Sequence, residues 1–154
     1  MKNIYLSLFL FFLSCINPKE SNQKKNISEV DKVSLVQDFQ IFHPKKNSFV
    51  DSLIQSVSEL SDLKVSIEDL TKLNPLGIES FLDETLIKCN NLLNLENNSF
   101  ISKPEIRGRL KVLKTNILKC KFNNNQNDIK KLNESLESLF LSYNILFERL
   151  EDFR

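Results

Sequence analysis

Residues 129–153 read IKKLNESLESLFLSYNILFERLEDF, and this stretch decides the fold. Its apolar side chains recur alternately three and four residues apart, at Ile129, Leu132, Leu136, Leu139, Tyr143, Leu146, Leu150 and Phe153. This spacing places them along one side of a continuous helix. Phe140 and Phe147 widen the apolar side, which indicates packing against more than one neighbour. The sequence therefore predicts a long C-terminal helix inside a helical bundle.

An earlier helix is predicted to begin near Asn47 or Ser48, since both residue types favour the first position of a helix. Its apolar positions change spacing near Ser61 and Asp62, where we expect a kink or a break. The sequence Asn74-Pro75-Leu76-Gly77 then predicts a turn that ends this helix.

Two further helices are expected between this turn and the C-terminal helix. One spans about 78–94, and the next begins where Ser102 and Glu105 have the spacing of a capping box. The apolar positions of the second of these helices are Ile106, Leu110, Leu113, Ile117 and Cys120. The predicted fold class is all-α, an antiparallel bundle of three to four helices joined by short loops.

The N-terminus shows the parts of an export signal in their usual order. Lys2 supplies a positive charge, and residues 4–13 are almost unbroken apolar. This run is too short to cross a bilayer, which takes about 20 apolar residues. The small residue Ser14 precedes Cys15, after which the chain becomes polar. We therefore expect a signal peptide over residues 1–14.

The tetrad Phe12-Leu13-Ser14-Cys15 resembles the lipobox of bacterial lipoproteins, although Phe12 stands where that family more often has leucine. The resemblance covers the first 15 residues. It implies cleavage before Cys15 and attachment of lipid to the Cys15 thiol, so that the membrane is a partner reached through this lipid. It also implies a place in the bacterial cell envelope, and we expect the outer membrane.

A tether is predicted between this anchor and the bundle. Residues 16–32 are polar, charged and without apolar periodicity, which is typical of a flexible linker. The more apolar residues 33–42 form either a short helix or an extended piece packed on the domain, and Pro44 ends it. The expected divisions are a signal peptide (1–14), the lipidated Cys15 with a mostly flexible tether (15–46) and a helical bundle domain (47–154).

Composition argues against several classes of protein. The chain has 21 basic and 20 acidic side chains, and loss of Lys2 leaves the mature part neutral, so no nucleic-acid partner is expected. Two glycines and no tryptophan argue against β-sandwiches and nucleotide-binding α/β folds. The single histidine, His43, has no partners at ligand spacing. No metal, cofactor or catalytic residue is predicted, and we expect no enzyme.

Two cysteines remain once Cys15 is assigned to lipid. Cys89 and Cys120 lie on the apolar sides of their predicted helices. In an exported chain they form either a disulfide or two buried thiols that act as small hydrophobic groups. A disulfide needs a close approach of the two backbones, which the sequence does not give, so both alternatives stay open.

Charge is divided unevenly along the chain. From Asp51 to Glu84 there are eight acidic and two basic side chains, and from Lys103 to Phe122 there are seven basic and one acidic. The simpler interpretation is that oppositely charged helices complement each other across the bundle. The alternative is a site on the basic helix for an anion, a lipid headgroup or a partner.

Arg107 and Arg109 are the candidate contacts of such a site, and they flank Gly108. Glycine inside a helix costs about 1 kcal/mol relative to alanine, so Gly108 predicts a close helix crossing or the approach of a ligand. Residues 104–115, with the C-terminal helix, are similar to the helical domain of small uncharacterised lipoproteins of Gram-negative bacteria. This resemblance covers roughly the last 50 residues and implies no activity.

These features together predict a membrane-anchored envelope lipoprotein with a structural role or a protein partner, and without catalytic activity. The alternative is a lipoprotein that binds a small molecule or a lipid in a pocket between helices. Such a pocket would be lined by Phe140, Tyr143 and Phe147 and guarded by Arg107 or Arg109.

Overall fold

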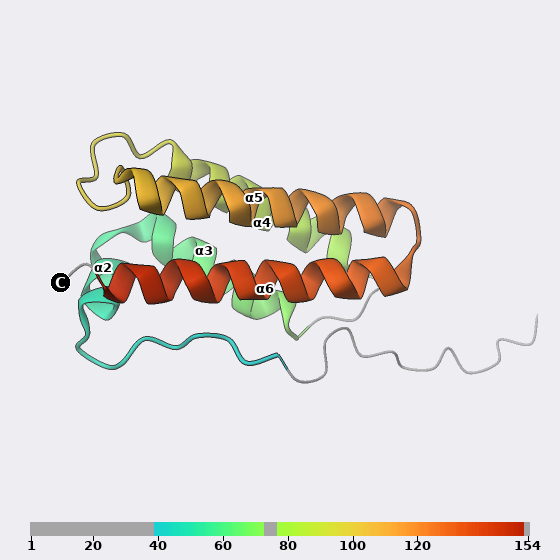
Figure 1. Ribbon diagram of the computed structural model, residues 1–154, viewed down its shortest axis with the longest axis horizontal. Helices are drawn as coiled ribbons and strands as arrows, with labels where there is room; N and C mark the ends of the chain where they lie inside the picture. The colour runs from blue at the N-terminus through green and yellow to red at the C-terminus, as the bar shows by residue number, and fades with distance from the viewer. Residues whose placement is uncertain (1–38, 73–76, 153–154) are drawn as a thin grey trace, which may run out of the picture. The chain divides into compact units, whose positions relative to one another are not determined.

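The computed structural model describes residues 39–72 and 77–152, and its regular secondary structure over these residues is helical (Figure 1). The helices in this part of the chain are α2 (Phe49–Ser56), α3 (Ser58–Leu70), α4 (Ile78–Leu93), α5 (Pro104–Asn125) and α6 (Ile129–Glu151). α2 and α3 are two halves of the first expected helix, so the predicted all-α bundle is confirmed. The signal peptide, Cys15 and residues 16–38 of the tether lie outside the described residues, as does the predicted turn at residues 74–76.

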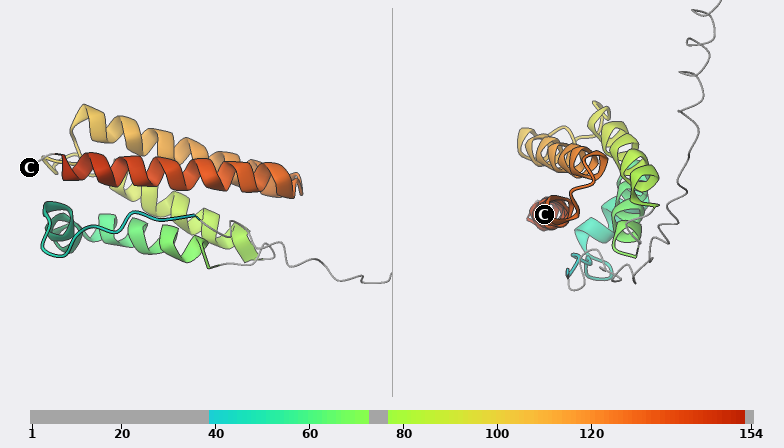
Figure 2. Two further views of the ribbon diagram at one scale, coloured as in Figure 1. Left: turned by 60° about the horizontal axis from the view of Figure 1, so that its bottom comes forward. Right: turned by 90° about the vertical axis from the view of Figure 1, so that its right-hand side faces the viewer.

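Helices that follow one another in the chain lie side by side, and the first of them also contacts the last. α5 contacts both α6 and α4, α3 contacts α4, and α2 contacts α6 (Figure 2). The predicted apolar side of α6 is buried from Leu132 to Leu150, with each of its expected positions at most 2% exposed. Ile129 is an exception at 48% exposed, because it is the first residue of α6 and lies at the end of the bundle. Phe153 lies outside the described residues.

The first expected helix breaks at Val57, not near Ser61 and Asp62. Val57 has extended backbone angles (φ −118°, ψ 97°), a conformation that its β-branched side chain favours. Its side chain is buried together with Leu53 and Leu60 on either side of the break. The break therefore lets the chain bend while its apolar positions stay in the core.

The two predicted helix starts have different outcomes. Ser48 caps α2 as expected, since its hydroxyl accepts a hydrogen bond from the backbone N–H of Asp51 at 3.1 Å. The capping box at Ser102 is wrong, because Lys103 occupies the cap position of α5 and makes no side-chain cap. The Ser102 hydroxyl instead lies 2.7 Å from the carbonyl oxygen of Glu96, and it donates a hydrogen bond within the preceding loop.

Gly108 does not mark a close helix crossing. It lies on the exposed side of α5, and a Cβ atom added there would meet no atom within 4 Å. The helix therefore tolerates a side chain at this position, and the expectation of a close helix crossing is wrong.

Candidate functional site

An extended segment of residues 39–43, which we call the strap, packs along the outside of the bundle before α2 begins (Figure 1). The ring of Phe39 lies 5.1 Å from that of Phe140, and the ring of Phe42 lies 6.3 Å from that of Phe147. Of the two conformations expected for residues 33–42, the extended one is found over the described part. The bundle thus includes residues that the sequence had assigned to the tether.

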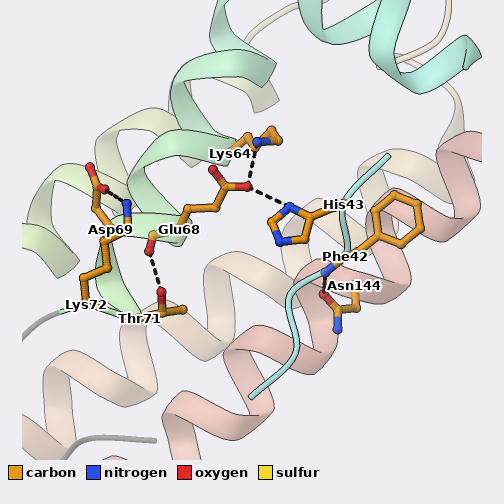
Figure 3. Close-up of polar contacts among 8 residues, drawn as sticks. All are labelled: Phe42, His43, Lys64, Glu68, Asp69, Thr71, Lys72 and Asn144. Carbon is orange, nitrogen blue, oxygen red and sulfur yellow. Dashed lines mark hydrogen bonds and ion pairs between the residues drawn. The ribbon is translucent and has the colours of Figure 1, made fainter. Parts of the chain in front are cut away.

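The side chain of Asn144 on α6 holds the backbone of the strap. Its Oδ1 accepts a hydrogen bond from the N–H of Phe42 at 2.8 Å, as Figure 3 shows. Its Nδ2 donates a hydrogen bond to the carbonyl oxygen of Gln40 at 2.9 Å. The side-chain amide thereby satisfies one donor and one acceptor of an extended backbone, as a neighbouring β-strand would do. Two contacts across more than 100 residues of sequence fix the strap to α6.

A groove of about 530 Å³ opens between the strap and the end of α3. It is lined by Phe39, Gln40, Ile41, His43, Glu68, Thr71 and Lys72. The carboxylate of Glu68 pairs with the Nζ atom of Lys64 at 2.6 Å and lies 3.5 Å from Nδ1 of His43 (Figure 3). The groove therefore combines an apolar wall from the strap with a polar wall from α3.

Several polar side chains of this groove are engaged within the chain. The Glu68 carboxylate is engaged by Lys64, and the side chain of His43 is 73% exposed, so neither is held against a nucleophile. Thr71 donates its hydroxyl to the carbonyl oxygen of Glu68 at 2.6 Å within the last turn of α3. Over residues 39–72 and 77–152, no three His, Cys, Asp or Glu side chains lie together as metal ligands would. The groove offers hydrogen bonds to a polar ligand.

Tyr143 lies in the core with its ring 4.4 Å from that of Phe147. Its hydroxyl is buried without a hydrogen-bond partner in the described structure. Burial raises the pKa of Tyr143 far above its ordinary range, and the negative charge of Glu68 adds to this effect. The hydroxyl therefore stays protonated in the folded chain.

The pocket expected between the helices is not formed. Phe140, Tyr143 and Phe147 are each at most 1% exposed, because Phe39 and Phe42 of the strap pack on that side of α6. Arg107 and Arg109 are partly exposed on α5 and do not line the strap groove. The aromatic residues are thus core residues, and the two arginines are surface residues.

The two cysteines on α4 and α5 are free and buried, so the structure has the thiol alternative and no disulfide. The Sγ atom of Cys89 lies 3.7 Å from the carbonyl oxygen of Leu110 and donates a weak hydrogen bond to it. Burial raises the pKa of Cys89 to about 12 and that of Cys120 to about 11. Neither thiol is poised to act as a nucleophile.

Charge pairing between α4 and α5 is found at one contact in the described chain, where Lys121 pairs with Asp83. The acidic helix α3 is instead linked to α4, through Lys88 and Asp62 at 3.4 Å. Neither Arg107 nor Arg109 has an ion pair within the described ranges. Of the basic side chains of α5, Lys111 and Lys119 are exposed and the others are partly buried.

The sequence did not identify the strap groove or Asn144. The apolar residues Phe39 and Phe42 were the available signal, because two aromatic side chains before a helix indicate a packed segment. Asn144 carried no signal, since an asparagine on the polar side of a helix is ordinarily solvated. Only the folded chain brings it to the strap.

The chain matches no protein-family model, no curated protein and no solved structure. Within the described ranges, no helix is both long enough and apolar enough to cross a membrane.

Proposed function

We propose that the protein is an envelope lipoprotein anchored by lipid on Cys15, whose bundle has a structural or protein-interaction role without catalysis. The observation that carries the proposal is the attachment of the strap to α6 through Asn144 and two aromatic contacts. The strap is the end of the segment that leads back to Cys15. A force applied at the lipid anchor would be transmitted to the bundle through the contacts between the strap and α6. Such a connection suits a domain that holds a partner near a membrane.

Exposed apolar side chains on α6 support a protein partner. Leu141 is 55% exposed and Ile145 is 36% exposed, and their spacing of four residues places them on the same side of the helix. They lie on the opposite side of α6 from its buried core positions. Neighbouring exposed apolar residues favour contact with another protein.

Two measurements on the full chain test the proposal. Mass spectrometry of the N-terminal peptide should show lipid on Cys15, and Cys15→Ser should abolish it. Capture from membranes in mild detergent should retain a stoichiometric partner. The variant Leu141→Ser/Ile145→Ser should lose this partner, whereas Ile87→Ser, at a 57% exposed position on α4, should keep it. An N-terminus without lipid, or a clean monomer, contradicts the proposal.

The strap groove favours a second candidate function, which is the binding of a small polar molecule. Its volume of about 530 Å³ falls within the range of known ligand sites, about 300–1,000 Å³. Native mass spectrometry of the purified chain should then show a bound compound. Glu68→Gln should remove it, and Glu79→Gln on the exposed first turn of α4 should not. If no compound is bound and no thermal shift occurs across a ligand panel, this candidate fails.

A further inference from the structure

The side of α5 and α6 that points away from α3 and α4 is uncovered in the described structure. Figure 1 and Figure 2 show α5 and α6 side by side in one layer, with α3 and α4 in another. On the uncovered side, residues of each helix recur alternately three and four positions apart, which aligns them in one row. We call the two rows the outer face, and every member is at least partly exposed. The row on α5 is Arg109, Val112, Asn116, Lys119 and Asn123, and the row on α6 is Glu134, Ser138, Leu141, Ile145 and Glu148.

Two hydrogen bonds hold these rows side by side. The Nδ2 atom of Asn116 donates to the carbonyl oxygen of Ser138 at 3.0 Å, and that of Asn123 donates to the carbonyl oxygen of Lys131 at 3.0 Å. The two contacts are seven residues apart on each helix and run in opposite directions. Each residue of α5 before Asn116 is therefore level with the residue of α6 equally far after Ser138.

The middle of the outer face is apolar. Val112 lies one turn from Asn116, and Leu141 lies one turn from Ser138 in the same direction, so the two apolar side chains are level. Val112 is 54% exposed, Leu141 is 55% exposed and Ile145 is 36% exposed. Exposed apolar side chains of two neighbouring helices thus adjoin, which favours contact with another protein.

The charged residues of the outer face are divided by sign between the two helices. The row on α5 carries Arg109 and Lys119 and no acidic residue, whereas the row on α6 carries Glu134 and Glu148 and no basic residue. Within residues 39–72 and 77–152, none of these four side chains forms an ion pair. By the register of the two helices, Lys119 lies within one residue of the level of Glu134. The face therefore has a basic half and an acidic half, on either side of its apolar middle.

We propose that the outer face is the contact between two copies of this chain, related by a two-fold axis parallel to the helices. This rotation places α5 of one copy on α6 of the other, so that each basic row meets an acidic row. It keeps residues at their level, so Lys119 comes opposite Glu134 of the other copy. The apolar residues are then enclosed by a polar rim, as in other protein interfaces. The inference rests on the proposed protein-interaction role and names a second copy as the partner of Leu141 and Ile145.

The outer face has the size that such a contact needs. α5 has 22 residues and α6 has 23, so both are about 35 Å long. Two helices of about 10 Å diameter make the face about 20 Å wide, which gives about 700 Å² on each copy. Specific protein interfaces bury about 800 Å² on each partner. The two helices thus supply nearly the whole area of a standard interface.

Reversal of charge tests the contact between copies. The full-length chain is prepared unchanged, as Lys119→Glu and as Glu134→Lys, and its mass in mild detergent is measured by light scattering. We expect the unchanged chain to be a dimer, and each variant alone to dissociate with a Kd at least about tenfold higher, because like charges then meet twice. An equal mixture of the two variants should form dimers again, since both contacts then join opposite charges. An ion pair within one chain would not be restored by mixing.

Lys111→Glu is the matched control, because Lys111 is exposed on α5 but lies outside the outer face. It should dimerise as the unchanged chain does, and circular dichroism should show that all three variants are helical. A monomeric unchanged chain overturns the proposal, and so do variants that dimerise normally or a mixture that stays monomeric.

The capture experiment separates this failure from that of the proposed function. If the chain is monomeric but retains another protein, and Leu141→Ser/Ile145→Ser releases that protein, the protein-interaction role stands and only the second copy is wrong. If the chain is monomeric and retains nothing, both fail.

Discussion

Replacing Asn144 with alanine removes both hydrogen bonds that hold the backbone of the strap on α6. The lost contacts are the 2.8 Å bond from the N–H of Phe42 and the 2.9 Å bond to the carbonyl oxygen of Gln40. Each such hydrogen bond contributes about 0.5–1.5 kcal/mol net, so Asn144→Ala should lower the free energy of unfolding by about 1–3 kcal/mol. The lower part of this range applies if water reaches the freed backbone groups, since Asn144 is only partly buried.

A second variant separates the two bonds. Asn144→Asp keeps an acceptor for the N–H of Phe42 but loses the donor to Gln40. It also places a carboxylate beside the carbonyl oxygen of Gln40, which is unfavourable. Its stability should fall as well, while the amide of Phe42 should stay protected from hydrogen exchange. In Asn144→Ala, that amide should exchange with the rate of local opening of the strap.

Urea denaturation and hydrogen exchange measure these effects, and Asn116→Ala is the matched control. Asn116 is also an amide that bridges to another element, with one hydrogen bond of 3.0 Å to the carbonyl oxygen of Ser138. Its loss should cost less and leave the exchange at Phe42 unchanged. If Asn144→Ala were no less stable than this control, and the Phe42 amide kept its protection, the inference that Asn144 fixes the strap would be refuted.

Three further predictions concern α5, the buried thiols and the core. Gly108→Ala should raise the free energy of unfolding by about 0.5–1 kcal/mol, because the site is an exposed helix interior with open space for a methyl group; a lower urea midpoint would contradict this. Cys89 and Cys120 have folded pKa values of about 12 and about 11, above the ordinary value of 9.0, so they lose protons first in the unfolded chain. The free energy of unfolding should therefore fall as the pH rises above about 9, and both thiols should resist alkylation until the chain unfolds; a flat pH profile or rapid labelling would show that they are accessible. Tyr143→Phe should keep or raise stability, by up to about 1 kcal/mol, because its buried hydroxyl lacks a partner; a marked loss would reveal one.

The helices could be predicted because their information is local. The second predicted helix, about 78–94, is found at Ile78–Leu93, and the apolar positions from Ile106 to Cys120 are all buried in α5. The spacing of apolar residues reports which side of a helix avoids water, whatever the neighbouring helix is. For the same reason Cys89 and Cys120 were expected to be buried, although their lack of a disulfide was not decided.

The sequence by itself thus determined an all-α chain, the register of its buried positions and the neutral, glycine-poor composition that sets it apart from several protein classes. Tertiary structure alone decided the break at Val57, the packing of Phe39 and Phe42 on α6, and the pairing of Asn144 with the strap. It also decided that Phe140 and Phe147 are covered and that Phe122 is exposed. These outcomes depend on contacts between residues far apart in the chain, which compete for the same surface and leave no periodic trace in the sequence.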